Sequence, residues 1–306
     1  MSKFSKISIS LFIFTLLLFF ISKNREIATL LNNTVCLFTR KLLGSISGVV
    51  RFSVFEFFCI LTPFLCFLSF FYIRKPRRIQ NIISVFLLMA SFYILNLGIA
   101  YNAKTDLSYE VSVKEEEILE SARSLLENIN SYSYPGDIAD IADCFPKEVK
   151  KIASSPLLTR LGVLGFYSFA TSEANINTLL PEYMYAFTVF HEMAHVNGYA
   201  REGEANLYAY IKLKETENEL FGYYADLYAI EHILNDVYKI SKEEYRNISS
   251  ALPDFARSDM KKYRELLEKH PEIKISKKIN DSYHSAFDKA SYSDFSRLIT
   301  LYLARS

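Results

Sequence analysis

The sequence predicts a mainly α-helical protein, in which transmembrane helices at the N-terminus precede an α-rich domain with one short β element. Hydrophobic residues make up 50% of the 306 residues, and in the first hundred they form runs of membrane-spanning length. From Pro181 onward the apolar spacing is helical almost throughout. One segment, residues 161–170, instead has the glycines and aromatic residues of a strand.

Three apolar segments are candidates for membrane spans. Residues 7–21 follow Lys3 and Lys6, and no small-residue cleavage site comes after them, so we expect an uncleaved span rather than a signal peptide. Residues 52–73 and 79–101 are each long enough to cross a bilayer as a helix. The lipid bilayer is therefore an expected partner.

A further helix is expected between the first two spans. In residues 27–50 the apolar side chains recur at helical spacing, but Arg40 and Lys41 interrupt them. This pattern favours an interfacial helix over a span. Residues 1–101 then form a membrane anchor, and residues 102–306 form a separate domain.

Charge indicates the orientation of the chain. Four basic residues lie in segment 74–78, between the second and third spans, and short basic loops stay in the cytoplasm. Residues 102–306 would then lie outside the cytoplasmic membrane. Basic residues in the loop after the first span weaken this scheme, but the reverse orientation would place the 74–78 cluster outside. The net charge of +1 offers no electrostatic basis for binding nucleic acid.

The second domain is expected to consist mainly of helices. Residues 114–129 carry three consecutive glutamates in the first turn, which suits the positive end of a helix dipole. Pro253 should interrupt the helical stretch in which it lies. Besides a helix after Pro181, further helices are expected in residues 147–154, 202–214, 218–238, 242–269, 280–290 and 294–304.

The chemistry of the domain is indicated by the pattern His191-Glu192-Met193-Ala194-His195. Two histidines four residues apart lie on one face of a helix, so both imidazoles can bind the same zinc ion. The glutamate that follows the first histidine is then placed to act as a general base. We therefore expect zinc as the cofactor.

A catalytic zinc site needs a third protein ligand, and two carboxylates follow closely. Gly198 lets the chain turn after the motif helix, so Glu202 or Glu204 can approach the metal. If a helix begins near Ala200, Glu202 and Asn206 share one face, whereas Glu204 points about 160° away from Glu202. We expect Glu202 to be the ligand. A carboxylate at this position would also stabilise a helix start without any metal.

Three interpretations of the motif are open. The first is a zinc enzyme. The second is a non-enzymatic membrane protein with a structural or regulatory zinc. A complete four-ligand coordination sphere that uses both glutamates would favour this interpretation. The third is a helical module without metal, because such a pattern also occurs by chance. Apolar neighbours such as Phe187 and Phe190 indicate a buried helix, where unpaired histidines are costly.

Two other segments have competing interpretations. Residues 162–169 are expected to lie extended beside the motif helix and to pair with a substrate backbone as an added strand, although a loop under the helices fits the composition equally well. The aromatic residues of segment 221–228 are expected to form the core face of a helix. One of these tyrosines would alternatively stabilise an oxyanion.

The remaining histidines and cysteines are expected to have packing or surface roles. His232, His270 and His284 are isolated in sequence. A disulfide between Cys36 and Cys144 is possible in an oxidising compartment, but their spacing does not support it.

The chain resembles an uncharacterised family of bacterial membrane proteins, catalogued as the domain of unknown function number thirty-eight-ten. The most specific resemblance lies in residues 187–210, and weaker matches lie at 165–175, 51–56, 280–283, 291–292 and 297–299. The family itself resembles zinc metallopeptidases with the His-Glu-x-x-His motif. Some of these enzymes carry a Glu-x-x-Ala-Asp pattern after the motif. Here Glu202-Gly-Glu-Ala-Asn206 ends in asparagine, which can hydrogen-bond a ligand histidine but supplies no charge.

The resemblance implies a zincin-like metallopeptidase domain behind the membrane anchor. Together with the motif, it leads us to expect a membrane-anchored zinc-dependent peptidase or related hydrolase that acts on a polypeptide substrate. His191, His195 and Glu202 would bind the zinc ion, and Glu192 would be catalytic.

Overall fold

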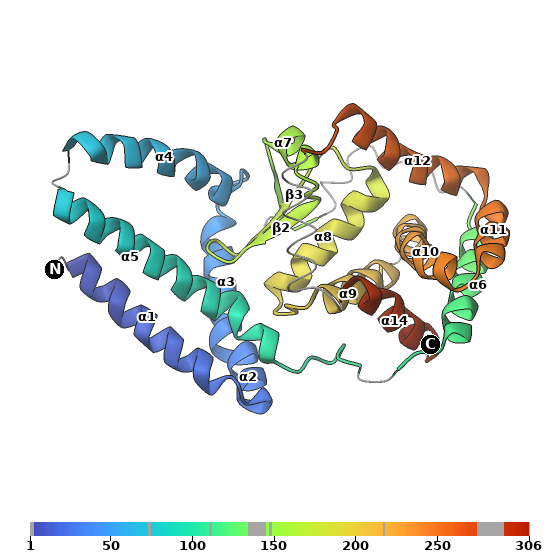
Figure 1. The fold of residues 1–306 in the computed structure, drawn as a ribbon, viewed down its shortest axis with the longest axis horizontal. Helices are drawn as coiled ribbons and strands as arrows, with labels where there is room; N and C mark the ends of the chain where they lie inside the picture. Colours follow the sequence, from blue (N-terminus) through green and yellow to red (C-terminus); the bar gives the residue numbers. More distant parts are fainter. Residues whose placement is uncertain are drawn as a thin grey trace.

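The computed structural model describes residues 3–72, 75–109, 112–133, 145–146, 149–216, 218–273 and 291–305. The described chain is mainly helical, with one three-stranded sheet, which confirms the predicted mainly α-helical content and the short β element. Figure 1 shows the helices of the first hundred residues on one side of the molecule and the helices of the second domain on the other, with the sheet between them.

Three long helices extend away from the sheet: α1 (Lys3–Ile21), α4 (Val54–Tyr72) and α5 (Lys75–Tyr93). Among the described residues, two stretches are long and apolar enough to cross a membrane, namely α1 and Arg77–Asn102. In α4 the described apolar stretch, Val54–Leu65, is shorter than a span. The predicted second span therefore stays a prediction.

The predicted helix between the first two spans is present. It consists of α2 (Arg25–Leu31), the π-helical turn η1 (Asn32–Cys36) and α3 (Leu37–Ser47), which follow one another without a break. The side chain of Asn24 caps its start by accepting hydrogen bonds from two backbone amides. In Figure 1 this stretch, hereafter the α2–α3 helix, crosses the ends of α1 and α5 at a steep angle.

After α5 the chain forms a second π-helical turn, η2 (Ile94–Gly98), and a short 3-10 turn, η3 (Ala100–Asn102). π-Helical turns are rare and often occur at functional sites. Here each of the two turns carries one buried asparagine, Asn32 in η1 and Asn96 in η2.

The sheet has the strand order β1-β3-β2, so β2 lies at an edge. β1 (Val149–Lys151) runs parallel and β2 (Gly165–Ser168) antiparallel to the central β3 (Glu173–Ile176). The predicted strand 161–170 is therefore confirmed only in its middle. Residues 161–164 instead form a turn and a short connection after α7 (Ser155–Arg160).

The predicted helix at residues 147–154 is wrong where the structure describes it, because Val149–Lys151 form β1. Pairing with β3 supplies the backbone partners of this segment, which local spacing cannot reveal. The side chain of Lys150 is fully buried, and its ammonium donates to the carbonyl oxygens of Ser47 (3.1 Å), the last residue of α3, and Val50 (2.5 Å).

The other helices of the second domain are α6 (Glu115–Ser131), α8 (Glu182–Val196), α9 (Glu202–Lys214), α10 (Glu219–Ile240), α11 (Lys242–Ala251), α12 (Asp254–Lys269) and α14 (Ser291–Leu303). The break between α11 and α12 falls at Pro253, as predicted, since proline has no backbone N–H for the helix ladder. The helix predicted at residues 280–290 lies outside the described residues.

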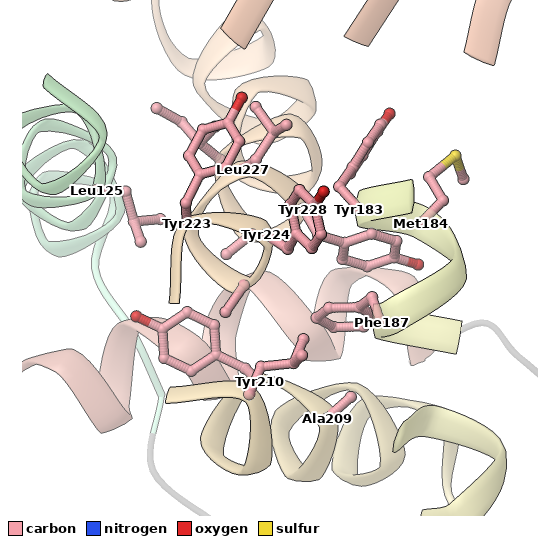
Figure 2. Packing of buried hydrophobic residues seen from close by; sticks show 14 of the residues in the cluster. Leu125, Tyr183, Met184, Phe187, Ala209, Tyr210, Tyr223, Tyr224, Leu227 and Tyr228 are labelled. Carbon is pink, nitrogen blue, oxygen red and sulfur yellow. The ribbon is translucent and has the colours of Figure 1, made fainter. Parts of the chain in front are cut away.

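The core of the domain surrounds α10, and Figure 2 shows its aromatic packing. The ring of Tyr228 stacks on Phe187 of α8 at 3.5 Å between centroids. The hydroxyl of Tyr223 donates to Asp259 and that of Tyr224 donates to Glu182. The predicted core role of this aromatic segment is confirmed, and both of these hydroxyls have their partners away from the histidine motif.

Candidate metal centre

The motif helix α8 presents both histidines on one face. It begins after Pro181 and runs to Val196 without an interrupting residue. The rings of His191 and His195 lie 5.0 Å apart between centroids and nearly at right angles to each other. Their side chains are only 15% and 9% exposed. Glycine at position 198 has φ +95°, a left-handed conformation that ends the helix and turns the chain back.

This turn brings Glu202, the first residue of α9, to the two histidines. Its Oε2 atom lies 3.0 Å from Nε2 of His191 and 3.8 Å from Nε2 of His195. In the part of the chain that the structure describes, this is the group of three potential ligands that lies within 4.8 Å. Glu204 is directed elsewhere, since its carboxylate accepts from Arg201 (2.7 Å) and Ser108 (2.7 Å).

Both imidazoles are oriented by hydrogen bonds on their other nitrogen. Nδ1 of His191 donates to the amide oxygen of Asn206 at 2.7 Å, and Nδ1 of His195 donates to the carbonyl oxygen of Tyr199 at 2.8 Å. Because both acceptors are carbonyl oxygens, Nδ1 carries the proton in each neutral ring. The Nε2 lone pairs are left facing Glu202, as metal-binding histidines require. Asn206 thus hydrogen-bonds His191, as the pattern Glu202-Gly-Glu-Ala-Asn206 suggested.

The three side chains fit a zinc ion. Two donor atoms that bind one zinc at about 2.0–2.1 Å in a tetrahedral arrangement lie about 3.3 Å apart. The distances from Glu202 to the two histidine nitrogens, 3.0 and 3.8 Å, bracket this value. Two imidazoles and one carboxylate are also a donor set found in catalytic zinc sites.

The electrostatics of the site couple protons to metal binding. Burial alone lowers the pKa of His191, but the hydrogen bond and charge of Glu202 outweigh it and raise this pKa to about 9. Burial lowers the pKa of His195, and the neighbouring His191 acts in the same direction. A proton on Nε2 of His191 would therefore compete with a metal ion at this site.

The predicted base, Glu192, is buried on the side of α8 that faces the sheet. Burial raises the pKa of its carboxyl group to about 8, although a hydrogen bond from the backbone amide of Tyr167 acts against this. The edge strand β2 packs closely here. A Cβ atom on Gly165 would lie 2.7 Å from Thr188 and 3.1 Å from Cγ of Glu192. As predicted, this part of the glycine-containing segment is extended and lies beside the motif helix.

The connection between His195 and Glu202 is held by the N-terminal helices, which the sequence did not indicate. Nδ2 of Asn32 donates to the carbonyl oxygen of Gly198 at 3.2 Å. The fully buried guanidinium of Arg40 donates to Oδ1 of Asn32 at 3.0 Å. A Cβ atom on Gly198 would lie 2.5 Å from Nη2 of Arg40, so this contact requires glycine.

Two further residues of the same connection bind the anchor side. Nη2 of Arg201 donates to the carbonyl oxygens of Tyr101 (3.1 Å) and Ala103 (3.2 Å). The hydroxyl of Tyr199 donates to Asp106 at 2.9 Å. The backbone turn that positions Glu202 therefore contacts the N-terminal part of the chain through three residues.

The sheet is attached to the N-terminal helices in a similar way. The fully buried carboxylate of Glu173 in β3 accepts hydrogen bonds from the amides of Val54 (2.9 Å) and Phe55 (3.0 Å), and so caps the start of α4. In the opposite direction, the carboxylate of Glu56 in α4 accepts hydrogen bonds from the backbone amides of Ala153 and Ser154, which precede α7.

The link on the other side of the sheet comes from η2, where Asn96 donates to the carbonyl oxygen of Phe169 at 2.8 Å. Polar residues inside apolar helices were the available sequence signal for Asn32, Arg40 and Asn96.

The isolated histidines and cysteines lie apart from this cluster where they are described. His232 packs against Tyr228 and Phe295, and burial lowers its pKa to about 4, which agrees with the expected packing role. Cys36 is a buried free thiol. His284 and Cys144 lie outside the described residues.

Comparison with known proteins identifies one family. The family model described as a protein of unknown function (DUF3810) matches residues 136–300, more than half of the chain. The matched region contains the motif helix and most of the helices that pack around it, whereas helices α1 to α6 precede it. No curated protein and no solved structure matches the chain.

Proposed function

Because the chain belongs to the DUF3810 family of proteins of unknown function, we propose its function from the geometry of the candidate site. It is a membrane-anchored, zinc-dependent peptidase or closely related hydrolase. The observation that carries this proposal is the convergence of donor atoms from His191, His195 and Glu202 within 4.8 Å, beside the buried Glu192.

His191, His195 and Glu202 would hold the zinc ion. Three protein ligands leave one coordination position open, which is typical of catalytic rather than structural zinc sites. Glu204, the candidate fourth ligand, is engaged by Arg201 and Ser108. This arrangement supports the enzyme over a structural or regulatory zinc protein.

The chain's own residues would supply proton transfer and substrate binding. When bound, the zinc ion would supply Lewis-acid activation of water and of a carbonyl group. Glu192 would accept a proton from the attacking water and return it to the leaving amine nitrogen. The outer edge of β2 would pair with an extended polypeptide substrate as an added strand, because β3 occupies only its inner edge.

We place the protein in the cytoplasmic membrane, with three spans near residues 7–21, 52–73 and 79–101. Residues 102–306 would lie on the extracytoplasmic side. Two stretches of sufficient length and hydropathy support the membrane location. Basic residues at the start of α5, including Arg77 and Arg78, support a cytoplasmic position for that end.

The experiment that tests the proposal separates metal binding from turnover in the full-length protein. Wild type should hold about one zinc per chain, the number that one three-ligand site binds. Glu192→Gln should retain the metal and lose hydrolysis by about 100-fold or more, since it removes the general base. The exposed Glu215→Gln is the matched control.

Two outcomes would refute the proposal. Equal zinc content in a His191→Ala, His195→Ala double variant would exclude a metal site at this position. Zinc binding without any hydrolysis of peptides would favour the non-enzymatic alternative.

A further inference from the structure

The outer face of the α2–α3 helix carries an apolar stripe that nothing in the described chain covers. Its four side chains are between 48% and 67% exposed, and they are Leu30, Phe38, Leu42 and Ile46. The last three are spaced four residues apart within α3, which places them on one helix face. An exposed apolar face of this length requires a partner.

The surroundings of the stripe identify a lipid bilayer as that partner. Exposed apolar residues at the end of α1, such as Phe20 and Ile21, precede the α2–α3 helix by a few residues. The helix also crosses α1 and α5 steeply, as a helix in the plane of a membrane would cross its spans (Figure 1). Exposed polar and basic residues, including Lys41 and Ser45, border the stripe and suit a headgroup layer.

The opposite face of the same helix contacts the turn that connects His195 to Glu202. Asn32 and Arg40 are buried there and contact Gly198, three residues after His195. The apolar stripe and the turn before Glu202 are therefore separated by the thickness of one helix, about 10 Å.

We infer that the site acts at the membrane surface, on polypeptide segments that are themselves anchored in the same bilayer. The α2–α3 helix lies in the headgroup layer through its apolar stripe. The inference rests on the proposed peptidase function for its chemistry. An extended chain advances about 3.3–3.6 Å per residue, so the cleaved bond should lie within about ten residues of the substrate's anchor.

The location can be tested without catalysis. Full-length protein, with its native cysteines replaced, is labelled with a fluorophore at Phe38→Cys, Asn197→Cys or Lys242→Cys and reconstituted in vesicles. Lipids brominated in the upper acyl chain should quench the label at position 38. A headgroup-attached quencher should quench the label at the exposed position 197. Neither should reach position 242 on the distant α11 (Figure 1). An unquenched label at position 38 overturns the inference, and cross-linking there between two chains would show a dimer interface instead.

The substrate class can be tested with a mixed-sequence peptide library in three forms. One is free, one is attached to a lipid by a linker of about five residues that reaches about 17 Å, and one by a flexible linker of about forty residues that spans about 35 Å. The short tether should be cleaved at least as fast as the long one, because both reach the site and the short one gives the higher effective concentration.

The remaining outcomes discriminate between the two proposals. Cleavage of the short tether that is about tenfold slower than that of the long tether would place the site far from the bilayer and overturn the inference. Absence of cleavage in all three forms would contradict the peptidase function, while the fluorescence result would still decide the location.

A pair of variants connects the stripe to this activity. Phe38→Glu with Leu42→Glu places two charges on the apolar stripe and should slow cleavage of the short-tethered library by about tenfold, with the free library unaffected. Ser45→Glu introduces a single charge of the same sign on the polar border of the same helix and should leave cleavage of both libraries unchanged. Equal effects of the stripe and border variants would count against lipid contact.

Discussion

The third metal ligand is decided between two carboxylates that are two residues apart on α9. We expect Glu202→Gln to weaken zinc binding by at least about tenfold, because it removes a donor atom from the cluster. Glu204→Gln should keep the metal, since its carboxylate binds Arg201 and Ser108. Competition with a chelator of known affinity measures both. Zinc loss in Glu204→Gln alone would reverse the assignment.

Asn32 connects the N-terminal helices to the turn that leads to the candidate metal centre. Asn32→Leu removes the donor to the carbonyl oxygen of Gly198 and leaves buried polar groups unpaired, which should cost about 1–3 kcal/mol of stability. It should also weaken zinc binding, because the turn before Glu202 loses its support. Thermal unfolding and chelator competition, in detergent, measure the two effects.

The adjacent asparagine is a matched control for this variant. Asn33 is exposed, so Asn33→Leu should change stability by no more than about 0.5 kcal/mol. A large loss in both variants would mean that the helix itself, rather than the contact with Gly198, is responsible.

At the scale of secondary-structure elements, α8, α10 and α12 contribute residues around one half-buried carboxyl group, that of Glu231. Glu231 on α10 accepts a hydrogen bond from Tyr183 of α8 at 2.9 Å, and Arg264 and Tyr263 of α12 face it. Burial raises the pKa of Glu231, although Tyr183 and Arg264 act in the opposite direction.

This pKa shift has a definite sign for stability. The native state binds a proton more tightly than the unfolded chain, so the contribution of Glu231 is fully present below its unfolded pKa and is lost as pH rises through the folded pKa. Glu231→Gln should therefore be more stable relative to wild type at pH 7 than at pH 4. Unfolding midpoints across this range measure it, with the exposed Glu243→Gln as control. An unchanged pH profile would contradict the assignment.

At the scale of the whole molecule, the candidate metal centre lies between the N-terminal helices and the helical domain. Both the turn before Glu202 and the sheet beside Glu192 are bound to residues of the first hundred or so. The N-terminal helices are therefore part of the framework of the site, and an experiment on the isolated second domain would lack these contacts.

The predicted orientation can be tested on the intact chain. A cysteine at Lys242 on α11 should react with a membrane-impermeant thiol reagent in intact cells, because residues 102–306 are expected outside. A cysteine at Arg77 should react only after the membrane is opened. The opposite pattern would refute the topology.

Local sequence patterns predicted those features that depend on near neighbours. Apolar runs, helical spacing and the break at Pro253 predicted the helices, because a helix satisfies its backbone within its own turn. The four-residue spacing of His191 and His195 likewise placed both side chains on one face of a helix, because helix geometry depends only on neighbouring residues. The three spans, the zincin likeness and the zinc ion itself stay predictions.

Only the tertiary structure decided which distant residues complete the site. Residues 149–151 became a strand because β3, more than twenty residues later, supplies their hydrogen-bond partners. Glu202 reached the histidines through a turn whose left-handed glycine is packed against Arg40, more than 150 residues earlier. Such contacts have no periodicity in the sequence. They form only when separate helices pack, because burial of Asn32 and Arg40 is favourable solely where their polar groups find partners.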